Sequence, residues 1–171
     1  MENLARLRER LLAACLLEGD FTLRSGKKSR YYLDKYRFVL DPALLAPLAE
    51  AIAAELPAET EVLAAPELGA VPLLAAVSLR TGLPGVIVRK AEKEYGTRNK
   101  IEGRLPAGAG VALLEDVVTT GGQAIASAEV LRDLGARIVA VIAVIDRGRE
   151  TTEAMAAAGL TYRPLFRVEL D

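Results

Sequence analysis

The sequence predicts an α/β fold built on a doubly wound, mainly parallel sheet with helices on both faces. Four short apolar runs, at residues 62–65, 85–88, 111–114 and 138–145, have the length of strands that are buried on both faces. Between these runs, apolar residues recur with helical spacing. The 171 residues predict a single domain that is large enough to bury a substantial core.

The composition excludes several classes of site. The chain has no histidine, which rules out a histidine base, a histidine-rich zinc site and a Ser-His-Asp triad. Its single cysteine excludes an internal disulfide framework and fits a reducing cytosol. A formal net charge of −1 argues against bulk binding of nucleic acid, and no apolar run approaches the roughly 20 residues of a membrane helix. We therefore expect a cytoplasmic protein without a membrane or nucleic-acid partner.

The N-terminal part predicts a helix followed by a basic hairpin. Gly19 is expected to end the helix, and a Ser-Gly turn at residues 25–26 separates two extended pieces, at residues 21–23 and 31–33. Four residues share the apolar face of the helix: Leu4, Leu7, Leu11 and Cys15. Six basic residues follow: Arg24, Lys27, Lys28, Arg30, Lys35 and Arg37. Charge alone is equally consistent with a solvated hairpin. We expect residues 1–40, together with the C-terminal tail, to form a small hood over the sheet edge.

The next elements alternate between helix and strand. Asp41 is a helix cap and Pro42 suits the first helical position, so a helix is expected from there until shortly before Pro57. The strand at residues 62–65 leads into the loop Pro66–Gly69, after which the spacing predicts another helix. These elements supply the first half of the sheet.

Residues 89–103, RKAEKEYGTRNKIEG, contain almost no apolar periodicity and predict a loop. A loop of this length in a compact domain is usually functional or disordered. A charged hairpin tip without a function is the alternative. Five residues give the segment its positive charge: Arg89, Lys90, Lys93, Arg98 and Lys100.

The stretch VALLEDVVTTGGQ, residues 111–123, is the central motif of the chain. Four apolar residues predict a strand that ends at Leu114, and a helical pattern begins at Ala124. The glycines between them allow backbone N–H groups to converge on one point, and the threonine hydroxyls add donors. Together with the start of the helix, these groups predict a phosphate site.

Glu115 and Asp116 repel a phosphate and therefore suit another part of the same ligand. Ionised carboxylates accept strong hydrogen bonds from sugar hydroxyls. A phosphate and a diol that are one sugar apart describe a ribose 5-phosphate. The alternative is an ordinary turn between strand and helix with a polar tip, although two unused acids there would cost stability.

The last predicted core strand, residues 138–145, is followed by Asp146, Arg147 and Gly148 at the carboxyl edge of the sheet. A guanidinium group binds planar carboxylates through two parallel hydrogen bonds, so Arg147 is a candidate for a carboxylate ligand. The alternative is a turn cation that pairs with Asp146. A short helix is expected around residues 152–158, before an extended tail.

These motifs resemble those of a known family. VALLEDVVTTGGQ is similar to the phosphoribosyl pyrophosphate (PRPP) signature of type I phosphoribosyltransferases, in the form found in orotate phosphoribosyltransferases. The segments FTLRSGKKSRYY, RKAEKEYG and DR resemble three further motifs of that family, in the same order. The resemblance implies a type I phosphoribosyltransferase fold and transfer of 5-phosphoribosyl from PRPP to orotate, a step of pyrimidine synthesis. It also implies Mg²⁺ as cofactor, held mainly by PRPP and not by side chains, and a homodimer in which the 89–103 loop reaches the neighbouring site.

The resemblance implies a role for individual residues. Those expected to bind PRPP are Arg24, Arg89, Lys90, Lys93, Tyr95, Glu115, Asp116, Val117, Val118, Thr119, Thr120, Gly121, Gly122 and Gln123. Those expected to bind orotate are Thr119, Arg147, Tyr32 and Leu33, the last two through their backbone. Three basic residues are expected to assist catalysis: Arg89, Lys90 and Lys93.

Three positions depart from the family pattern. Tyr95 stands where the family usually has histidine, Gly69 where some members have lysine, and Arg24 where lysine is common. These departures keep two alternatives open. One is a phosphoribosyltransferase for another base, and the other is a regulator of the same fold that senses PRPP or nucleotide, with RNA on a basic face.

Overall fold

The structure is a computed structural model that describes residues 3–22, 26, 28–90 and 100–169. Two sheets form within this part of the chain, one with two strands and one with six. The small sheet pairs β1 (Leu16–Thr22) with β2 (Lys28–Leu33) in antiparallel orientation. The strands of the large sheet are β3 (Val62–Pro66), β4 (Gly85–Val88), β5 (Ile101–Glu102), β6 (Gly110–Val118), β7 (Arg137–Asp146) and β8 (Tyr162–Arg167).

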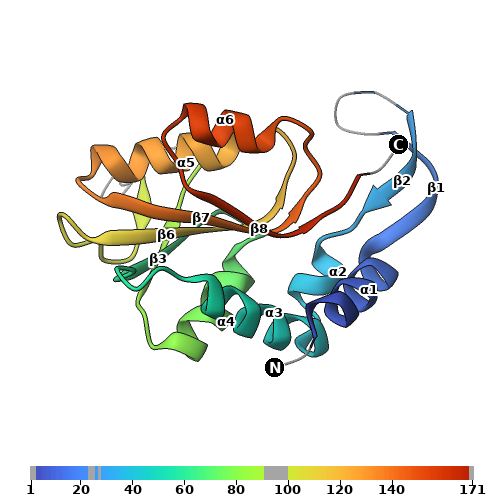
Figure 1. The fold of residues 1–171 in the computed structure, drawn as a ribbon, viewed down its shortest axis with the longest axis horizontal. Helices are drawn as coiled ribbons and strands as arrows, with labels where there is room; N and C mark the ends of the chain where they lie inside the picture. Colours follow the sequence, from blue (N-terminus) through green and yellow to red (C-terminus); the bar gives the residue numbers. More distant parts are fainter. Residues whose placement is uncertain (1–2, 23–25, 27, 91–99, 170–171) are drawn as a thin grey trace.

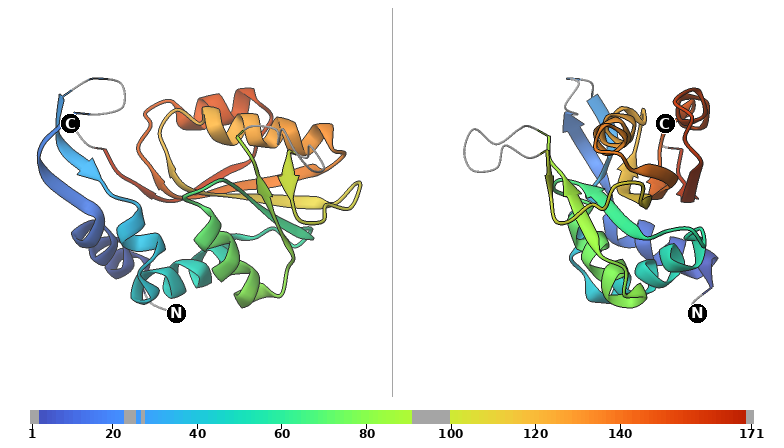
Figure 2. Two further views of the ribbon diagram at one scale, coloured as in Figure 1. Left: turned by 180° about the vertical axis from the view of Figure 1, so that it is seen from behind. Right: turned by 90° about the vertical axis from the view of Figure 1, so that its left-hand side faces the viewer.

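The large sheet has the order β5-β4-β3-β6-β7-β8. Its pairs are parallel, except for the short antiparallel pair of β4 and β5. Helices cover both faces, as Figures 1 and 2 show, with α3 and α4 on one side and α5 and α6 on the other. The bounds of these helices are α3 (Pro42–Glu55), α4 (Val71–Thr81), α5 (Gly122–Asp133) and α6 (Thr151–Ala157). The predicted doubly wound, mainly parallel fold is confirmed.

The central strand β6 separates two hydrophobic cores. Ala112 and Leu114 belong to the core beneath α3 and α4, whereas Val111 and Leu113 belong to the core beneath α5. All four side chains are fully buried. Alternate residues of a strand point to opposite faces, so a continuous apolar run is required when helices cover both faces.

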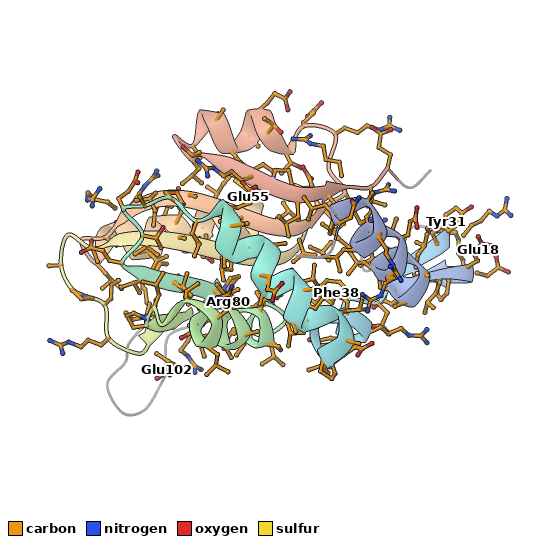
Figure 3. All side chains as sticks on the ribbon, turned by 60° about the horizontal axis from the view of Figure 1, so that its bottom comes forward. Glu18, Tyr31, Phe38, Glu55, Arg80 and Glu102 are labelled. Carbon is orange, nitrogen blue, oxygen red and sulfur yellow. The ribbon has the colours of Figure 1, made fainter. Side chains whose placement is uncertain are left out.

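The N-terminal part consists of α1 (Leu4–Cys15), the hairpin β1–β2 and the short helix α2 (Tyr36–Val39), which the sequence did not predict. Phe38 of α2 is fully buried in the core that α1 and α3 share, where Figure 3 labels it. The hairpin lies beyond the ends of β6 and β7 (Figure 1). Helix α1 ends at Cys15, not at the predicted Gly19, because Leu16 is already extended and pairs with Leu33 of β2.

Two further predictions need correction. The tail was expected in the hood, but Tyr162–Arg167 forms β8, a parallel strand at the edge of the large sheet. Phe166 is buried in the core, and Pro164 is tolerated because an edge strand leaves one side of its backbone unpaired. The 89–103 segment is not a loop throughout, because Ile101–Glu102 pairs with β4 as β5. None of the helices in the described part of the chain is long and apolar enough to cross a membrane.

Candidate active site

The two acids of the central motif lie inside β6, near its carboxyl end. The strand continues through Val118, whereas the sequence predicted that it ends at Leu114. Pairing with β7 explains the extension, because Glu115 aligns with Ala143 and the pairing continues to the end of both strands. Both acids are buried, with exposed fractions of 4% for Glu115 and 3% for Asp116. The sheet therefore holds them in fixed positions.

A tight loop joins β6 to α5. Gly121 has a φ of 80°, a left-handed conformation that glycine adopts without strain, and α5 begins at the next residue. The Gly122 N–H donates to Thr120 Oγ1 over 3.4 Å. The first N–H groups of α5, a helix of 12 residues, have no partner within the helix. Such groups, together with the helix dipole, favour a bound phosphate.

The acids and the loop surround one hollow of about 260 Å³. Its lining is Lys35, Glu115, Asp116, Val117, Val118, Thr119, Thr120, Gly121, Gly122, Gln123 and Ala124. All nine residues that the sequence assigned to PRPP between positions 115 and 123 therefore meet at one site. The hollow contains phosphate donors at the loop and carboxyl groups at the strand.

Burial changes the chemistry of Glu115. Loss of hydration raises the pKa of its carboxyl to about 8, and the negative charge of Asp116 acts in the same direction. The charges of Lys35 and Lys90 oppose these effects only in part. At neutral pH the Glu115 carboxyl is thus mainly protonated, and it can donate a hydrogen bond as well as accept one. The sequence predicted two ionised acids, and the raised pKa of Glu115 argues against this for one of them.

Asp116 is paired with a lysine that the sequence analysis did not place in the site. Lys35 Nζ lies 2.7 Å from Asp116 Oδ2, and the Val117 N–H donates to Asp116 Oδ1 over 2.6 Å. Lys35 directly precedes α2. In the sequence it is one of six basic residues between positions 24 and 37, and no local signal distinguishes it. Only the packing of the N-terminal part against the sheet brings it to Asp116.

A second hollow, of about 200 Å³, lies beside the start of the basic 89–103 segment. Arg89 and Lys90 line it together with Gln123, which also lines the first hollow. The Lys90 N–H donates to Glu67 Oε1 over 2.8 Å, so the loop after β3 is tied to the end of β4. Arg89 Nη1 lies 3.3 Å from Glu102 Oε1 of β5. Three other predicted site residues lie outside the described part of the chain: Arg24, Lys93 and Tyr95.

The two residues predicted to offer their backbone to orotate lie at the end of β2. The Leu33 side chain is buried in the core, so that only its main chain can reach a ligand. Tyr32 is 45% exposed, and its ring centroid lies 5.5 Å from that of Phe21. Leu33 pairs with Leu16, next to the end of α1. That the backbone of Tyr32 and Leu33 binds orotate stays a prediction.

Arg147 lies just beyond β7, and its backbone N–H donates to Val118 O over 2.8 Å. Its Nε is buried and has no hydrogen-bond partner, and burial lowers the pKa of its guanidinium. The alternative in which Arg147 pairs with Asp146 is not supported, because Asp146 has other partners. Arg147 as a whole is half-buried, and a buried Nε without a partner is costly, so an anionic ligand at this guanidinium would be favourable.

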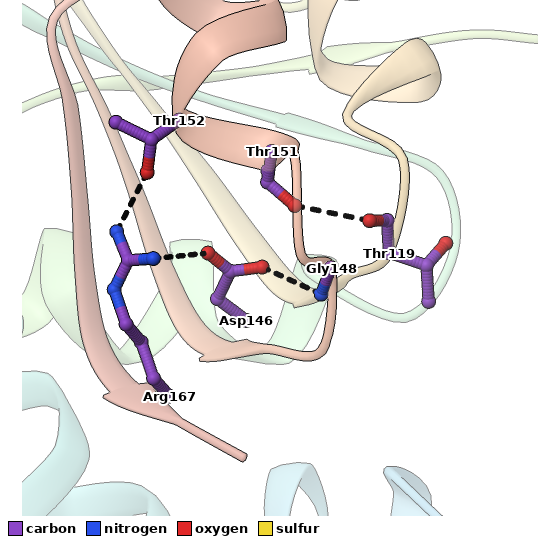
Figure 4. Close-up of polar contacts among 6 residues, drawn as sticks. All are labelled: Thr119, Asp146, Gly148, Thr151, Thr152 and Arg167. Atoms are coloured by element: carbon purple, nitrogen blue, oxygen red, sulfur yellow. Dashed lines mark hydrogen bonds and ion pairs between the residues drawn. The ribbon is translucent and has the colours of Figure 1, made fainter. Parts of the chain in front are cut away.

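Figure 4 shows the polar contacts that Asp146 makes instead. Asp146 Oδ1 accepts from the Gly148 N–H over 2.9 Å, and Oδ2 lies 3.8 Å from Arg167 Nη1 of β8. Thr151 Oγ1 donates to Thr119 O over 3.0 Å. A Cβ on Gly148 would overlap Thr119 O and Thr151 Oγ1, so this contact requires glycine. The turn that carries Arg147 is therefore fixed against the phosphate loop.

Comparisons with known proteins agree with this geometry. The profile of the phosphoribosyl transferase domain family matches residues 41–158 of the chain. An orotate phosphoribosyltransferase of Thermococcus gammatolerans is 44% identical over 167 residues, which cover 95% of this chain and 88% of that protein. The matched length thus includes the N-terminal part as well as the sheet.

Two solved structures of Mycobacterium tuberculosis orotate phosphoribosyltransferase are similar to this fold. The complex with inorganic phosphate has a TM-score of 0.83 at 30% identity and covers 96% of this chain and 95% of that chain. The complex with PRPP has a TM-score of 0.77 at 31% identity, with coverage of 96% and 95%. The chain therefore belongs to the orotate phosphoribosyltransferase family, whose members carry the phosphoribosyl transferase domain.

Proposed function

We propose that this protein transfers the 5-phosphoribosyl group of PRPP to orotate, giving orotidine 5′-monophosphate and pyrophosphate, in the synthesis of pyrimidine nucleotides. The observation that carries the proposal is the single hollow in which two buried carboxyl groups of β6 lie beside the glycine-threonine loop. Sugar hydroxyls suit the first feature and a phosphate suits the second. The half-buried Arg147, whose Nε has no hydrogen-bond partner, would supply a carboxylate site beside the same loop.

The 5′-phosphate of PRPP would accept hydrogen bonds from the loop of residues 119–122 and from the start of α5. Asp116 would accept from a ribose hydroxyl, and the neutral Glu115 could exchange both a donor and an acceptor with the other hydroxyl. Arg89 and Lys90, at the second hollow, would face the pyrophosphate. Lys93, Tyr95 and Arg24 are proposed to join them on the strength of the sequence motifs.

The reaction breaks the bond between C1 of the ribose and the pyrophosphate oxygen, while a ring nitrogen of orotate forms the new bond at C1. The proton of that nitrogen leaves to the departing pyrophosphate or to water. Positive charge develops on the ribose and negative charge on the leaving group, as in glycoside chemistry. The carboxylate of Asp116 stabilises the first charge, and the cations of the 89–103 segment stabilise the second. No covalent intermediate with a protein side chain is required.

Mg²⁺ is the proposed cofactor. Within the residues that the structure describes, no three acidic or cysteine side chains cluster as metal ligands would. The resemblance to the family implies that the oxygen ligands of this cation would come mainly from PRPP. When bound, such a cation would neutralise charge on the departing pyrophosphate. The protein's part is to hold the ribose and the phosphate groups in position.

Orotate recognition is proposed to depend on Arg147. Its planar guanidinium can bind the carboxylate of orotate through two parallel hydrogen bonds. Thr119 would contact the ring from the phosphate loop, and the backbone of Tyr32 and Leu33 from the hairpin. Uracil lacks the carboxylate and would leave Arg147 unsatisfied, so the site should discriminate against it.

We further propose a homodimer in the cytoplasm, in which the 89–103 segment closes over the site of the neighbouring subunit. The proposal rests on the family motif in that segment and on its charge. Sedimentation velocity would measure the assembly state. Mixing a variant that lacks the segment's cations with one that lacks Asp116 would restore activity if the segment acts across the dimer.

The test of the reaction is the fall in the ultraviolet absorbance of orotate on addition of PRPP and Mg²⁺ to the purified protein. Uracil and hypoxanthine serve as parallel acceptors. Consumption of orotate alone supports the proposed function. Consumption of another base would identify a different phosphoribosyltransferase. Binding of PRPP without turnover, seen as protection against heat, would identify a nucleotide-sensing protein of this fold.

A further inference from the structure

Three segments that are far apart in the sequence meet at Asp116. Lys35 comes from the N-terminal part, Gly69 from the loop after β3, and Asp116 from β6. The Lys35 side chain is 36% exposed, whereas that of Asp116 is only 4% exposed. The lysine thus reaches from the surface to a buried carboxylate, and it also lines the hollow formed by residues 115–124.

Gly69 is the position that admits the Lys35 side chain. A Cβ at Gly69 would overlap Asp116 Oδ2 and Lys35 Nζ and would lie 2.7 Å from Lys35 Cε. Gly69 is not among the described glycines with a positive φ, so its backbone conformation is open to other residues. The requirement for glycine is therefore one of space, and the ion pair occupies that space.

The ion pair leaves Asp116 able to accept a further hydrogen bond. Oδ1 is engaged by the backbone N–H of Val117. Oδ2 is buried and, although it lies 2.7 Å from Lys35 Nζ, has no hydrogen-bond partner of suitable geometry. A carboxylate oxygen accepts through two lone pairs, so Oδ1 can accept a ribose hydroxyl from the hollow beside the Val117 N–H, while Lys35 holds Oδ2.

Two acidic groups lie next to each other in this strand, and Lys35 is the ion-pair partner of one of them. An isolated carboxylate at a buried site costs several kcal/mol and would take up a proton instead. The negative charge of a carboxylate strengthens its hydrogen bonds to sugar hydroxyls. Lys35 offsets this cost at the place where the ligand is held.

We propose that Lys35 is a positioning residue for PRPP, which holds the Asp116 carboxylate in the orientation that meets the ribose hydroxyls, and that Gly69 must lack a side chain to admit it. The identity of the ligand rests on the proposed function. Lys35 acts through Asp116, so its loss affects the binding of PRPP and leaves the orotate side of the site intact.

The test compares four variants with the wild-type protein: Lys35→Met, Lys35→Arg, Gly69→Ala and the double variant Lys35→Met/Gly69→Ala. Arg37→Met is the matched control, because Arg37 is a neighbouring cation of α2 whose partner is Asp34, outside the hollow. The KM values for PRPP and orotate and kcat are measured separately, together with the melting temperature of each variant. Orotate turnover by the wild-type protein tests the proposed function independently of any variant.

We expect Lys35→Met to raise the KM for PRPP by roughly ten- to a hundredfold, less than for loss of one partner of a fully buried charge pair, because the Lys35 side chain is partly exposed. The KM for orotate should stay within about twofold, and Lys35→Arg should recover most of the loss because it restores the charge. Gly69→Ala should raise the KM for PRPP in the same way. If both substitutions act through one ion pair, the KM for PRPP of the double variant should not exceed that of the more impaired single variant.

Two results would overturn the proposal. One is a KM for PRPP within about twofold of wild type in Lys35→Met, or in Gly69→Ala should the first variant fail to fold, since an effect of one charge pair exceeds that range. The other is a double variant in which the fold increase of the KM for PRPP equals the product of the two single increases. That result would mean that Gly69 and Lys35 act independently.

Discussion

The acids of the site and the cations around them are held in different ways. Glu115 and Asp116 lie in a strand of nine residues that is paired with β7 to its end, and both are buried. On the pyrophosphate side, Arg89 and Lys90 lie just beyond the end of β4, where the Arg89 side chain is 28% exposed and Lys90 is exposed. The ribose side of the site is rigid, whereas the pyrophosphate side is made of groups that solvent can reach.

The difference has a chemical reason. A diol must be met by acceptors at fixed distances, and a strand provides this at no further entropic cost. A leaving group that carries charge away needs cations that can follow it and then release it. Arg147 belongs to the rigid side, because the contacts of Gly148 and Thr151 fix its turn against the phosphate loop (Figure 4).

Loss of Asp116 is the most damaging change we predict on the rigid side. Asp116→Ala removes a ribose acceptor and leaves Lys35 without its partner, so kcat/KM for PRPP should fall by about a thousandfold, or about 4 kcal/mol. Steady-state assays with PRPP as the varied substrate measure this. The control is Asp133→Ala at the exposed end of α5, which should retain full activity. A loss below tenfold would show that the strand is not the main ribose contact.

The substitution Arg147→Met asks whether the rigid side also selects the base. It removes the proposed partner of the orotate carboxylate, so the KM for orotate should rise by about a hundredfold, near 3 kcal/mol for hydrogen bonds to a charged group. The KM for PRPP should not change. Arg104→Met, at an exposed position after β5, is the control. Equal increases in both KM values would mean that Arg147 supports the phosphate loop and does not read the base.

The pH dependence of the free energy of unfolding should show how much stability the burial of Glu115 costs. The unfolded chain releases the Glu115 proton near the ordinary carboxyl pKa of about 4.3, whereas burial raises the pKa of Glu115 in the folded protein to about 8. Between these values the folded state binds more protons. Its stability should therefore fall as the pH rises, by up to about 1.4 kcal/mol per pH unit, and level off above the folded pKa.

Glu115→Gln isolates this effect because the amide does not titrate. The free energy of unfolding of the wild-type protein minus that of the variant should decline from about pH 5 to about pH 8. Urea denaturation at fixed pH values measures this difference. A difference that stays constant over that range would show that Glu115 is charged in the folded protein at neutral pH.

The smallest expected effect concerns a cation outside the site. Arg37 lies two residues from Lys35, and its Nε is 3.4 Å from Asp34 Oδ2 in an exposed i, i+3 pair. Arg37→Met should change the free energy of unfolding by less than about 0.5 kcal/mol and leave both KM values unchanged. Thermal melts and the orotate assay check this. A clear rise in the KM for PRPP would mean that total positive charge, and not the position of Lys35, matters on this side.

The sequence by itself determined where four buried strands lie along the chain, where the helices between them lie, and where the phosphate loop with its two acids lies. These features depend on short-range chemistry: apolar runs that suit strands buried on both faces, and glycines that suit a phosphate loop. The errors lie where long-range pairing decided the outcome. β6 runs four residues past Leu114 because β7 continues beside it, and the tail becomes β8 because β7 offers it an edge.

Only the tertiary structure decided which charges face each other. Lys35 reaches Asp116 beside Gly69, which has no side chain in the way, and burial raises the pKa of Glu115. Asp146 lies near Arg167, and the Nε of Arg147 has no hydrogen-bond partner. The strength of a charge pair and the cost of removing a group from water depend on distance and burial in three dimensions. Neither quantity can be read from the order of residues, which is why the sequence located the site but not its electrostatic balance.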